Sequence, residues 1–181
     1  RVTPRGINYR LAQNIHFSPS YIVSKKGIET DQTKIDAIKK FQNPSCIKHL
    51  RSFLGLTNYY RKFLKDYAKY SKVLEGLCGK NKDKKIIWTE ECEEAFRKLK
   101  EKMIDTPILA YPDFEKEFIL DTDASFDTIG AVLSQKDTYG RERVIAYGSH
   151  KMNKHELGYC VTRKELLAIY YFTQNFKHFL Y

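Results

Sequence analysis

The stretch from Phe118 to Leu133 constrains this chain more than any other, because it combines two apolar strands with a pair of carboxylates. Its sequence, FILDTDASFDTIGAVL, predicts a strand that ends in Asp121 and Asp123, a tight turn, and a second strand that returns beside the first. A buried carboxylate is costly unless it is paired or binds a metal. The pattern therefore allows two interpretations, a surface hairpin with solvated acids or a metal-holding carboxylate at the centre of a sheet.

The last part of the sequence predicts an amphipathic helix. Thr162 is a candidate N-cap, and Glu165 follows one turn later. The residues at helical spacing form one stripe: Leu166, Ile169, Tyr170, Thr173 and Phe176. A glutamate near a helix start usually caps the helix or compensates its dipole. Taken alone, the position of Glu165 favours that structural role.

Several different motifs follow one another along the chain. They are His49–Phe63 (HLRSFLGLTNYYRKF), Ile87–Phe96, Pro107–Phe114, Asp123-Ala-Ser, Ile129–Gln135, Val144–His150 and Arg163–Ile169 (RKELLAI). The last four together resemble the ribonuclease H domain of long-terminal-repeat retrotransposon polyproteins, with the Ty3/gypsy type as the nearest match. The earlier motifs resemble the reverse-transcriptase segment that precedes that domain. The resemblance covers about Ile22 to Tyr181.

This resemblance implies a fold and an activity. The expected fold is α/β (α+β), with a helical polymerase thumb/connection followed by a truncated ribonuclease H-like mixed sheet with a helix. The expected parts are a divergent segment (1–20), a thumb/connection-like helical module (21–79), and a linker with a ribonuclease H-like domain (80–181). The implied activity is RNA-directed DNA synthesis with hydrolysis of the RNA strand of RNA–DNA hybrids. A catalytically inactive nucleic-acid-binding remnant and an interaction or scaffold module remain as alternatives.

The implied hydrolysis requires carboxylates, because two divalent ions about 4 Å apart must bracket the scissile phosphate. Mg²⁺ suits this role and prefers oxygen ligands. By resemblance, Asp123 matches the family's first catalytic carboxylate and Glu165 the second, and both are expected to bind metal. Asp121 has the same strand parity as Asp123, so alternation cannot separate them and only the motif decides.

The family's third catalytic aspartate lies on a strand after the helix that carries Glu165, and the sequence ends at Tyr181 before it. The polymerase's own aspartates would precede Arg1. We therefore expect an incomplete fragment of a Pol polyprotein, or a decayed copy, with an incomplete two-metal site and no cleavage activity of its own. The remaining Pol segments are its expected protein partners.

The positive charge is concentrated in one part of the chain. Between Lys34 and Lys85 there are 14 Lys or Arg residues and four acidic residues, a surplus that equals the whole chain's formal net charge of +10. Such a basic module favours duplex nucleic acid or an RNA–DNA hybrid as a partner, although a solvated lysine-rich surface has the same composition. The residues expected to contact nucleic acid are Lys48, Arg51, Arg61, Lys62 and Lys65.

Local signals predict the elements of the first half. A strand is expected at Tyr21–Ser24, a helix opened by Asp31 with Ile35 and Ile38 inward, and helices at about 47–54, 57–64 and 71–77. Thr89 is expected to cap a further helix. The apolar stripe of that helix is Cys92, Ala95, Phe96, Leu99 and Met103. A polar, turn-rich hinge is expected at 79–85.

The hydropathy of the sequence and the spacing of its cysteines bear on where the protein resides. No apolar run approaches the length of a membrane span, and no signal-peptide pattern opens the sequence. The four cysteines, Cys46, Cys78, Cys92 and Cys160, are far apart and lack metal-ligand spacing. We therefore expect an intracellular protein, in the cytoplasm or nucleus, with reduced thiols.

Overall fold

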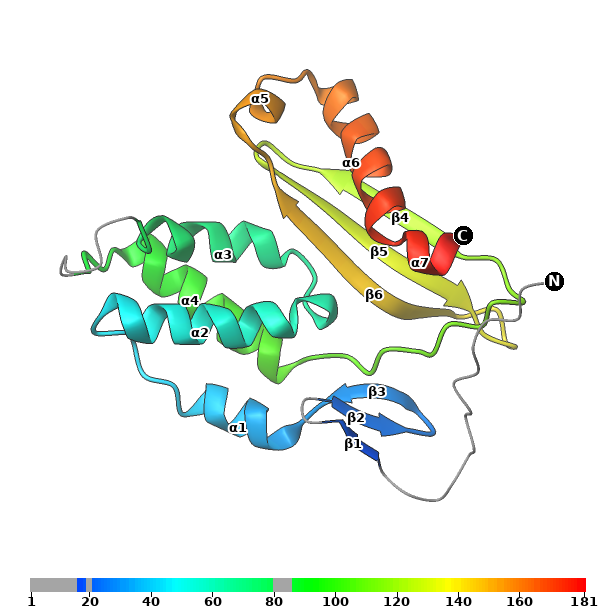
Figure 1. The fold of residues 1–181 in the computed structure, drawn as a ribbon, viewed down its shortest axis with the longest axis horizontal. Coiled ribbons are helices and arrows are strands. Elements are labelled where there is room, and N and C mark those ends of the chain that lie inside the picture. Colours follow the sequence, from blue (N-terminus) through cyan, green and yellow to red (C-terminus); the bar gives the residue numbers. More distant parts are fainter. Residues whose placement is uncertain (1–15, 19–20, 80–85) are drawn as a thin grey trace.

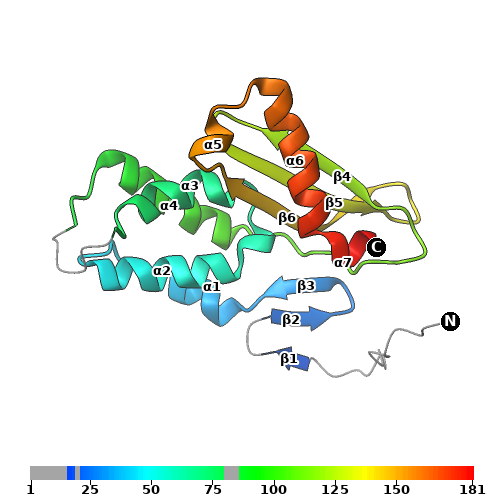
Figure 2. The ribbon, with the colours of Figure 1, turned by 45° about the horizontal axis from the view of Figure 1, so that its top comes forward.

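The structure is a computed structural model that describes residues 16–18, 21–79 and 86–181 (Figure 1). The expectations for most of the divergent segment 1–20 and for the hinge at 80–85 lie outside the described residues. The described part consists of a small N-terminal sheet, a group of helices, and a second sheet covered by further helices (Figures 1 and 2). The predicted α+β class is confirmed.

The N-terminal sheet is an antiparallel meander of β1 (His16–Ser18), β2 (Tyr21–Ser24) and β3 (Gly27–Thr30). The strand β2 has the predicted bounds. Gly27 has φ +137°, a conformation that side-chain-bearing residues rarely adopt, and a Cβ there would clash with the carbonyl oxygen of Leu109. This close approach lets Ile28 and Leu109 exchange two backbone hydrogen bonds of 2.8 and 2.9 Å, which tie the meander to the following part of the chain.

Two helices begin where their capping residues predict. Asp31 accepts a hydrogen bond from the Thr33 amide at 2.8 Å and opens α1 (Gln32–Lys39), and Thr89 accepts one from the Cys92 amide at 3.3 Å and opens α4 (Glu90–Ile104). The predicted inward residues of both helices are buried. Both helices, their caps and their buried faces are therefore confirmed.

The middle helices differ from the prediction. The two helices expected at 47–54 and 57–64 are one continuous helix, α2 (Ile47–Tyr59), followed by the short 3-10 helix η1 (Arg61–Phe63). Gly55 is exposed with open space around it, and a helix tolerates a glycine there at a modest cost. The next helix, α3 (Tyr67–Gly76), begins four residues before the expected start, after Asp66 turns the chain with φ 61°.

These helices enclose one aromatic core. Phe53 of α2 and Phe96 of α4 lie with their ring centroids 4.5 Å apart, and Trp88 contacts Phe96 edge-on at 5.8 Å. Leu50, Phe63 and Leu74 are almost fully buried in the same cluster. Burial of so much apolar surface holds α2, α3 and α4 together as one packed unit.

The second sheet contains the predicted strand–turn–strand. The order is β4 (Ile119–Ala124), β5 (Thr128–Lys136) and β6 (Glu142–Lys151), and all three described strands run antiparallel. The helices α5 (Lys154–Leu157), α6 (Val161–Asn175) and α7 (Lys177–Leu180) follow, and α6 lies across one face of the sheet (Figures 1 and 2). The predicted succession of three strands and a long helix is confirmed.

The sheet-facing side of α6 is not the predicted stripe. The buried residues are Lys164, Ala168 and Phe172. The predicted ones are largely exposed: Leu166 by 60%, Ile169 by 50% and Tyr170 by 68%. The prediction was wrong because α6 carries apolar residues on two faces, and periodicity alone cannot say which of them meets the sheet. The helix also begins at Val161, so Cys160 and not Thr162 is the N-cap.

The residues at the end of α6 are better covered than expected. The sequence predicts Tyr170, Tyr171, Phe176 and Phe179 to be partly bare. Tyr170 is exposed, and Tyr171 and Phe179 are half-buried, but Phe176 is buried. Its ring and that of Phe172 approach the backbone of β6 at Gly148, where an added Cβ would lie 2.6 Å from Phe172 and 3.1 Å from Phe176. This close packing explains why Phe176 is not exposed.

The helical unit and the sheet are joined through β6. Val144 and Tyr147 of β6 pack against the helical core, whereas Ile145 and Ala146 pack with α6 on the opposite side. The Ala68 amide of α3 also donates a hydrogen bond to the Ser149 hydroxyl at 3.0 Å. The sheet is therefore packed between α6 on one face and the α3–η1 region on the other.

A partly buried ion pair strengthens this junction. Lys72 of α3 contacts both carboxylate oxygens of Asp127, in the turn between β4 and β5. In a double-mutant cycle, Lys72→Ala and Asp127→Ala should show a coupling of about 1 kcal/mol in the free energy of unfolding, measured by urea denaturation. The exposed pair Lys116–Asp113 is the control, and its coupling should be near zero. Equal coupling in both cycles would contradict a special role for the Lys72 pair.

No helix within the described ranges has the length and apolar character needed to cross a membrane.

Candidate functional site

The strand β4 directs its two aspartates away from α6. Leu120 and Ala124 pack into the cluster that contains the buried residues of α6. Successive side chains of a strand point to opposite faces, so Asp121 and Asp123 lie on the other face, and both are exposed. Asp123 is paired with Gly130 of β5 on that face.

The face that carries Asp123 is turned toward the start of α3. An added Cβ on Gly130 would lie 3.8 Å from the carboxylate oxygen Oδ1 of Asp66, the residue before α3. The negative charge of Asp66 also raises the pKa of Tyr147, after the larger effect of burial. The helical unit thus covers the β6 side of this face and leaves the aspartates of β4 accessible.

Glu165 lies in the first turns of α6 and is exposed. Its neighbour Lys164 is buried and donates a hydrogen bond of 2.6 Å to the carbonyl of Phe126, in the turn between β4 and β5. This contact places the start of α6 at the end of the sheet where β4 ends. Glu165 and Asp123 are therefore brought to the same end of the sheet, from opposite faces of β4.

The convergence of Asp123 and Glu165 on one ion stays a prediction. Because α6 covers the face that Asp123 does not use, a shared ion would have to lie around the outer edge of β4. Within the described ranges, no three His, Cys, Asp or Glu side chains form a group that could hold a metal ion. These residues alone do not fit a two-metal site, so no metal-dependent step follows from them.

The five candidate nucleic-acid contacts differ in their surroundings. Lys48 and Lys65 are exposed, while the Arg51 guanidinium donates a 3.0 Å hydrogen bond to the carbonyl of Cys78 just beyond α3. Arg61 and Lys62 lie in η1 and line a pocket. Arg61 and Lys62 thus line a pocket, Lys48 and Lys65 are exposed, and the Arg51 side chain has a structural contact.

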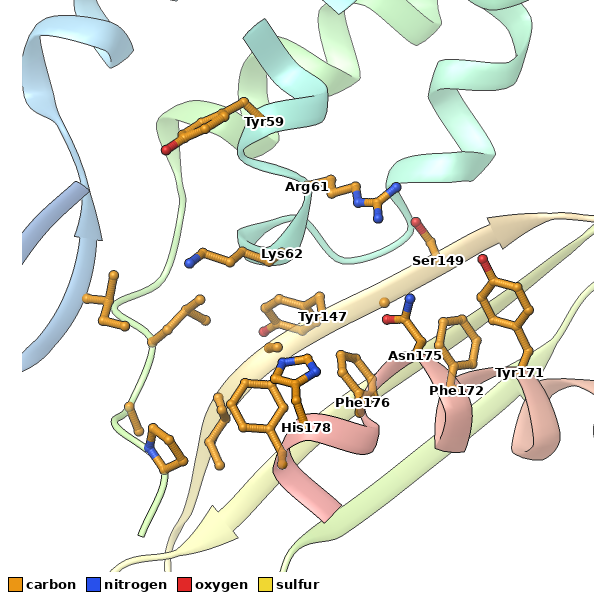
Figure 3. A pocket seen from close by; sticks show the side chains of 18 of the residues that line it. Tyr59, Arg61, Lys62, Tyr147, Ser149, Tyr171, Phe172, Asn175, Phe176 and His178 are labelled. Carbon is orange, nitrogen blue, oxygen red and sulfur yellow. The ribbon is translucent and has the colours of Figure 1, made fainter. Parts of the chain in front are cut away.

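The pocket that includes Arg61 and Lys62 has a volume of about 360 Å³. It lies where the end of α2 and η1 meet β6 and the helices α6 and α7 (Figure 3). The sequence did not predict this pocket, and it did not connect Asn175 or His178 with the basic residues of η1. No local signal could have done so, because these residues are more than 100 positions apart and meet only across β6.

Aromatic rings contact the ammonium group of Lys62. Its ammonium group lies 4.0 Å from the centroid of the Tyr21 ring, and Tyr21 stacks on Tyr59 with 5.0 Å between the ring centroids. Burial lowers the pKa of Lys62, and burial raises the pKa of the neighbouring Tyr60 to about 12. Lys62 is therefore a partly desolvated cation beside an aromatic cluster.

Comparisons with a family model and with known proteins indicate the same family. Residues 88–181 match the family described as "RNase H-like domain found in reverse transcriptase". The chain is 44% identical over 170 residues to the retrovirus-related Pol polyprotein from transposon opus of Drosophila melanogaster, covering 89% of this chain and 17% of that protein. It is 37% identical over 160 residues to the transposon Tf2-3 polyprotein of Schizosaccharomyces pombe, covering 88% and 12%. The chain thus spans less than a fifth of the length of these relatives.

Solved structures show the same fold. The foamy viral protease-reverse transcriptase dRH in complex with double-stranded DNA matches with a TM-score of 0.76 and 22% identity, over 88% of this chain and 28% of that one. The foamy viral protease-reverse transcriptase in complex with an RNA/DNA hybrid matches with a TM-score of 0.74 and 23% identity, over 87% and 21%. At this identity the similarity concerns the arrangement of helices and strands.

Proposed function

Because the chain belongs to the reverse-transcriptase RNase H-like family, within Ty3/gypsy-type Pol polyproteins, we propose that it binds nucleic acid for reverse transcription and RNA-strand hydrolysis. In this role the helical unit binds an RNA–DNA hybrid or duplex, and the second sheet contributes carboxylates to the nuclease. The family match over 88–181 carries the proposal.

Nucleic-acid binding is supported by charge and by fold. The basic surplus between Lys34 and Lys85 falls largely on the helical unit, and Lys48 and Lys65 are exposed there. The foamy viral enzymes of the same fold were solved with double-stranded DNA and with an RNA/DNA hybrid. We infer that Lys48, Arg51, Arg61, Lys62 and Lys65 contact phosphates, which gives affinity with little sequence preference.

The nuclease role is supported by the motifs around Asp123 and Glu165. We propose that both carboxylates contribute ligands to a Mg²⁺ site, and a bound ion there would supply the positive charge that hydrolysis of the scissile phosphate needs. The described residues do not complete such a site, so further ligands would have to come from other Pol segments. On this proposal the chain alone binds nucleic acid but does not cleave it. A catalytically inactive nucleic-acid-binding remnant, the alternative function, would behave in the same way.

Binding should depend steeply on salt. If these five basic side chains contact phosphates, raising the salt concentration from about 50 to 200 mM should weaken binding of a labelled RNA–DNA hybrid about 500-fold. Lys48→Glu and Lys65→Glu should each weaken binding, whereas Lys136→Glu, an exposed control on β5, should not. Fluorescence anisotropy at several salt concentrations measures this. An affinity that does not change with salt would argue against phosphate contacts.

A further inference from the structure

The pocket beside β6 carries positive charge without compensating carboxylates. Arg61 and Lys62 supply this charge from η1, the His178 imidazole lines the pocket from α7, and none of the pocket's described lining residues is Asp or Glu. Cationic side chains that have no acidic partner in the same pocket attract an anion, because no carboxylate there offsets their charge. The composition therefore selects for an anionic ligand.

Three polar side chains of this pocket are available to a ligand. Within the part of the chain that the structure describes, the side chains of Arg61, Asn175 and His178 form no hydrogen bond or ion pair. Figure 3 shows Arg61 extending from the helical side and Asn175 and His178 from the opposite side of β6. The pocket can thus present donors to one ligand from both sides.

The remaining wall is aromatic and apolar. Tyr147 of β6 lies between the two polar sides in Figure 3, and Phe172 and Phe179 line the pocket from α6 and α7. Aromatic rings stack on nucleobases with little preference for the base. A volume of about 360 Å³ is within the range of small-ligand sites and suits a ligand of one nucleotide, whereas a duplex is far too wide.

We propose that this pocket binds a single nucleoside phosphate, with its phosphate toward Arg61 and Asn175 and its base against Tyr147 on the His178 side. The nucleotide is either free in solution or an unpaired nucleotide of a strand, since both present the same chemistry. The proposal rests on the pocket's own residues and does not require the metal-dependent hydrolysis proposed above.

Calorimetric titration of the 181-residue chain tests the ligand class. Adenosine 5′-monophosphate should bind at least tenfold more tightly than inorganic phosphate or adenosine, because it alone uses both the cations and the rings. Inorganic phosphate binding as tightly as the nucleotide would overturn the proposal in favour of a simple anion patch. Adenosine binding as tightly, or no heat from the nucleotide at millimolar concentration, would also overturn it.

Substitutions in and beside the pocket locate the binding. Arg61→Ala should weaken nucleotide binding about tenfold, the expected effect of losing one charge-assisted hydrogen bond to the phosphate, and His178→Ala should weaken it by a few fold because it removes a polar contact beside the base. Lys177→Ala is the matched control, because Lys177 is exposed on the same helix and does not line the pocket. It should change the affinity by less than twofold. Asn175→Leu, a polar-to-apolar exchange of similar size, gives a second test if either alanine variant loses its circular-dichroism spectrum.

A competition titration identifies the source of the nucleotide. Titrations of two variants then distinguish this inference from the proposed function. A single-stranded oligonucleotide that competes with the free nucleotide identifies a strand as the source, and one that does not compete identifies the free nucleotide. His178→Ala should leave binding of a fully paired hybrid unchanged, whereas Lys48→Glu should weaken the hybrid and leave the nucleotide unchanged. Loss of hybrid binding alone would refute the proposed function, and loss of nucleotide selectivity alone would refute this inference.

Discussion

The 181-residue chain is expected to release no fragments from a labelled RNA–DNA hybrid in Mg²⁺, whereas a longer chain with the downstream Pol segment should cleave it. The physical reason is the number of ligands, because two ions need more oxygens than Asp123 and Glu165 supply. In the longer chain, Asp123→Asn should lower the cleavage rate about 1,000-fold, since a lost ligand forfeits several kcal/mol of charge stabilisation in the transition state. Gel separation of the labelled products measures the rate.

Asp121→Asn is the matched control for this experiment. Asp121 lies on the same strand and the same face as Asp123, and both are exposed, so the two substitutions remove the same charge from nearly the same place. Of the two aspartates, only Asp123 is proposed to bind the metal, so Asp121→Asn should keep the rate within a few fold. Efficient cleavage by the 181-residue chain itself, lost on Asp123→Asn, would show that fewer ligands suffice.

Phe172→Ala should have the largest effect on stability. Phe172 is 1% exposed and packs between the β6 backbone at Gly148 and the rings of Tyr171 and Phe176. Truncating a buried phenylalanine removes its burial and leaves a cavity, which together should cost about 3–5 kcal/mol in the free energy of unfolding. Urea denaturation followed by circular dichroism gives this value.

Tyr170→Ala on the same helix is the control for that prediction. Tyr170 is 68% exposed, so its truncation should cost less than about 1 kcal/mol. The comparison also tests which face of α6 meets the sheet. A larger loss from Tyr170→Ala than from Phe172→Ala would mean that the exposed stripe is the buried one, as the sequence pattern first indicated.

Local signals were sufficient wherever a helix has one apolar face and a capping side chain. Asp31 and Thr89 mark the first turns of α1 and α4 because each supplies an oxygen to an unpaired amide. The buried stripe of α4 followed directly from its spacing. These features depend on residues within a few positions of one another, which is why the sequence alone is enough to predict them.

The face of α6 could not be predicted in the same way. Its apolar residues occupy both sides, with Ala168 and Phe172 on one and Leu166 and Ile169 on the other. The choice between them is made by the sheet, because the rings of Phe172 and Phe176 fit against Gly148 of β6. A contact between residues about 25 positions apart has no signature in the spacing of either segment.

The candidate site shows the same division. The family motifs single out Asp123 and Glu165, but only the pairing of β4 with β5 shows that Asp123 lies on the face opposite α6. The pocket is harder still to predict, because Arg61 and His178 are more than 100 positions apart in the sequence. Local motifs therefore indicate which residues are candidates for the site, whereas the packing of the sheet determines which side chains lie together.

The position of β6 between two apolar clusters has a consequence for how the protein unfolds. Val144 and Tyr147 belong to the helical core, and Ile145 and Ala146 belong to the core under α6, so one strand is shared by both. Unfolding of either core exposes β6, and the other core then loses the β6 side chains that pack in it. The helical and sheet halves should thus melt as one cooperative unit, and a hydrogen-exchange map should show the β6 amides that bond to β5 exchanging as slowly as the buried amides of both cores.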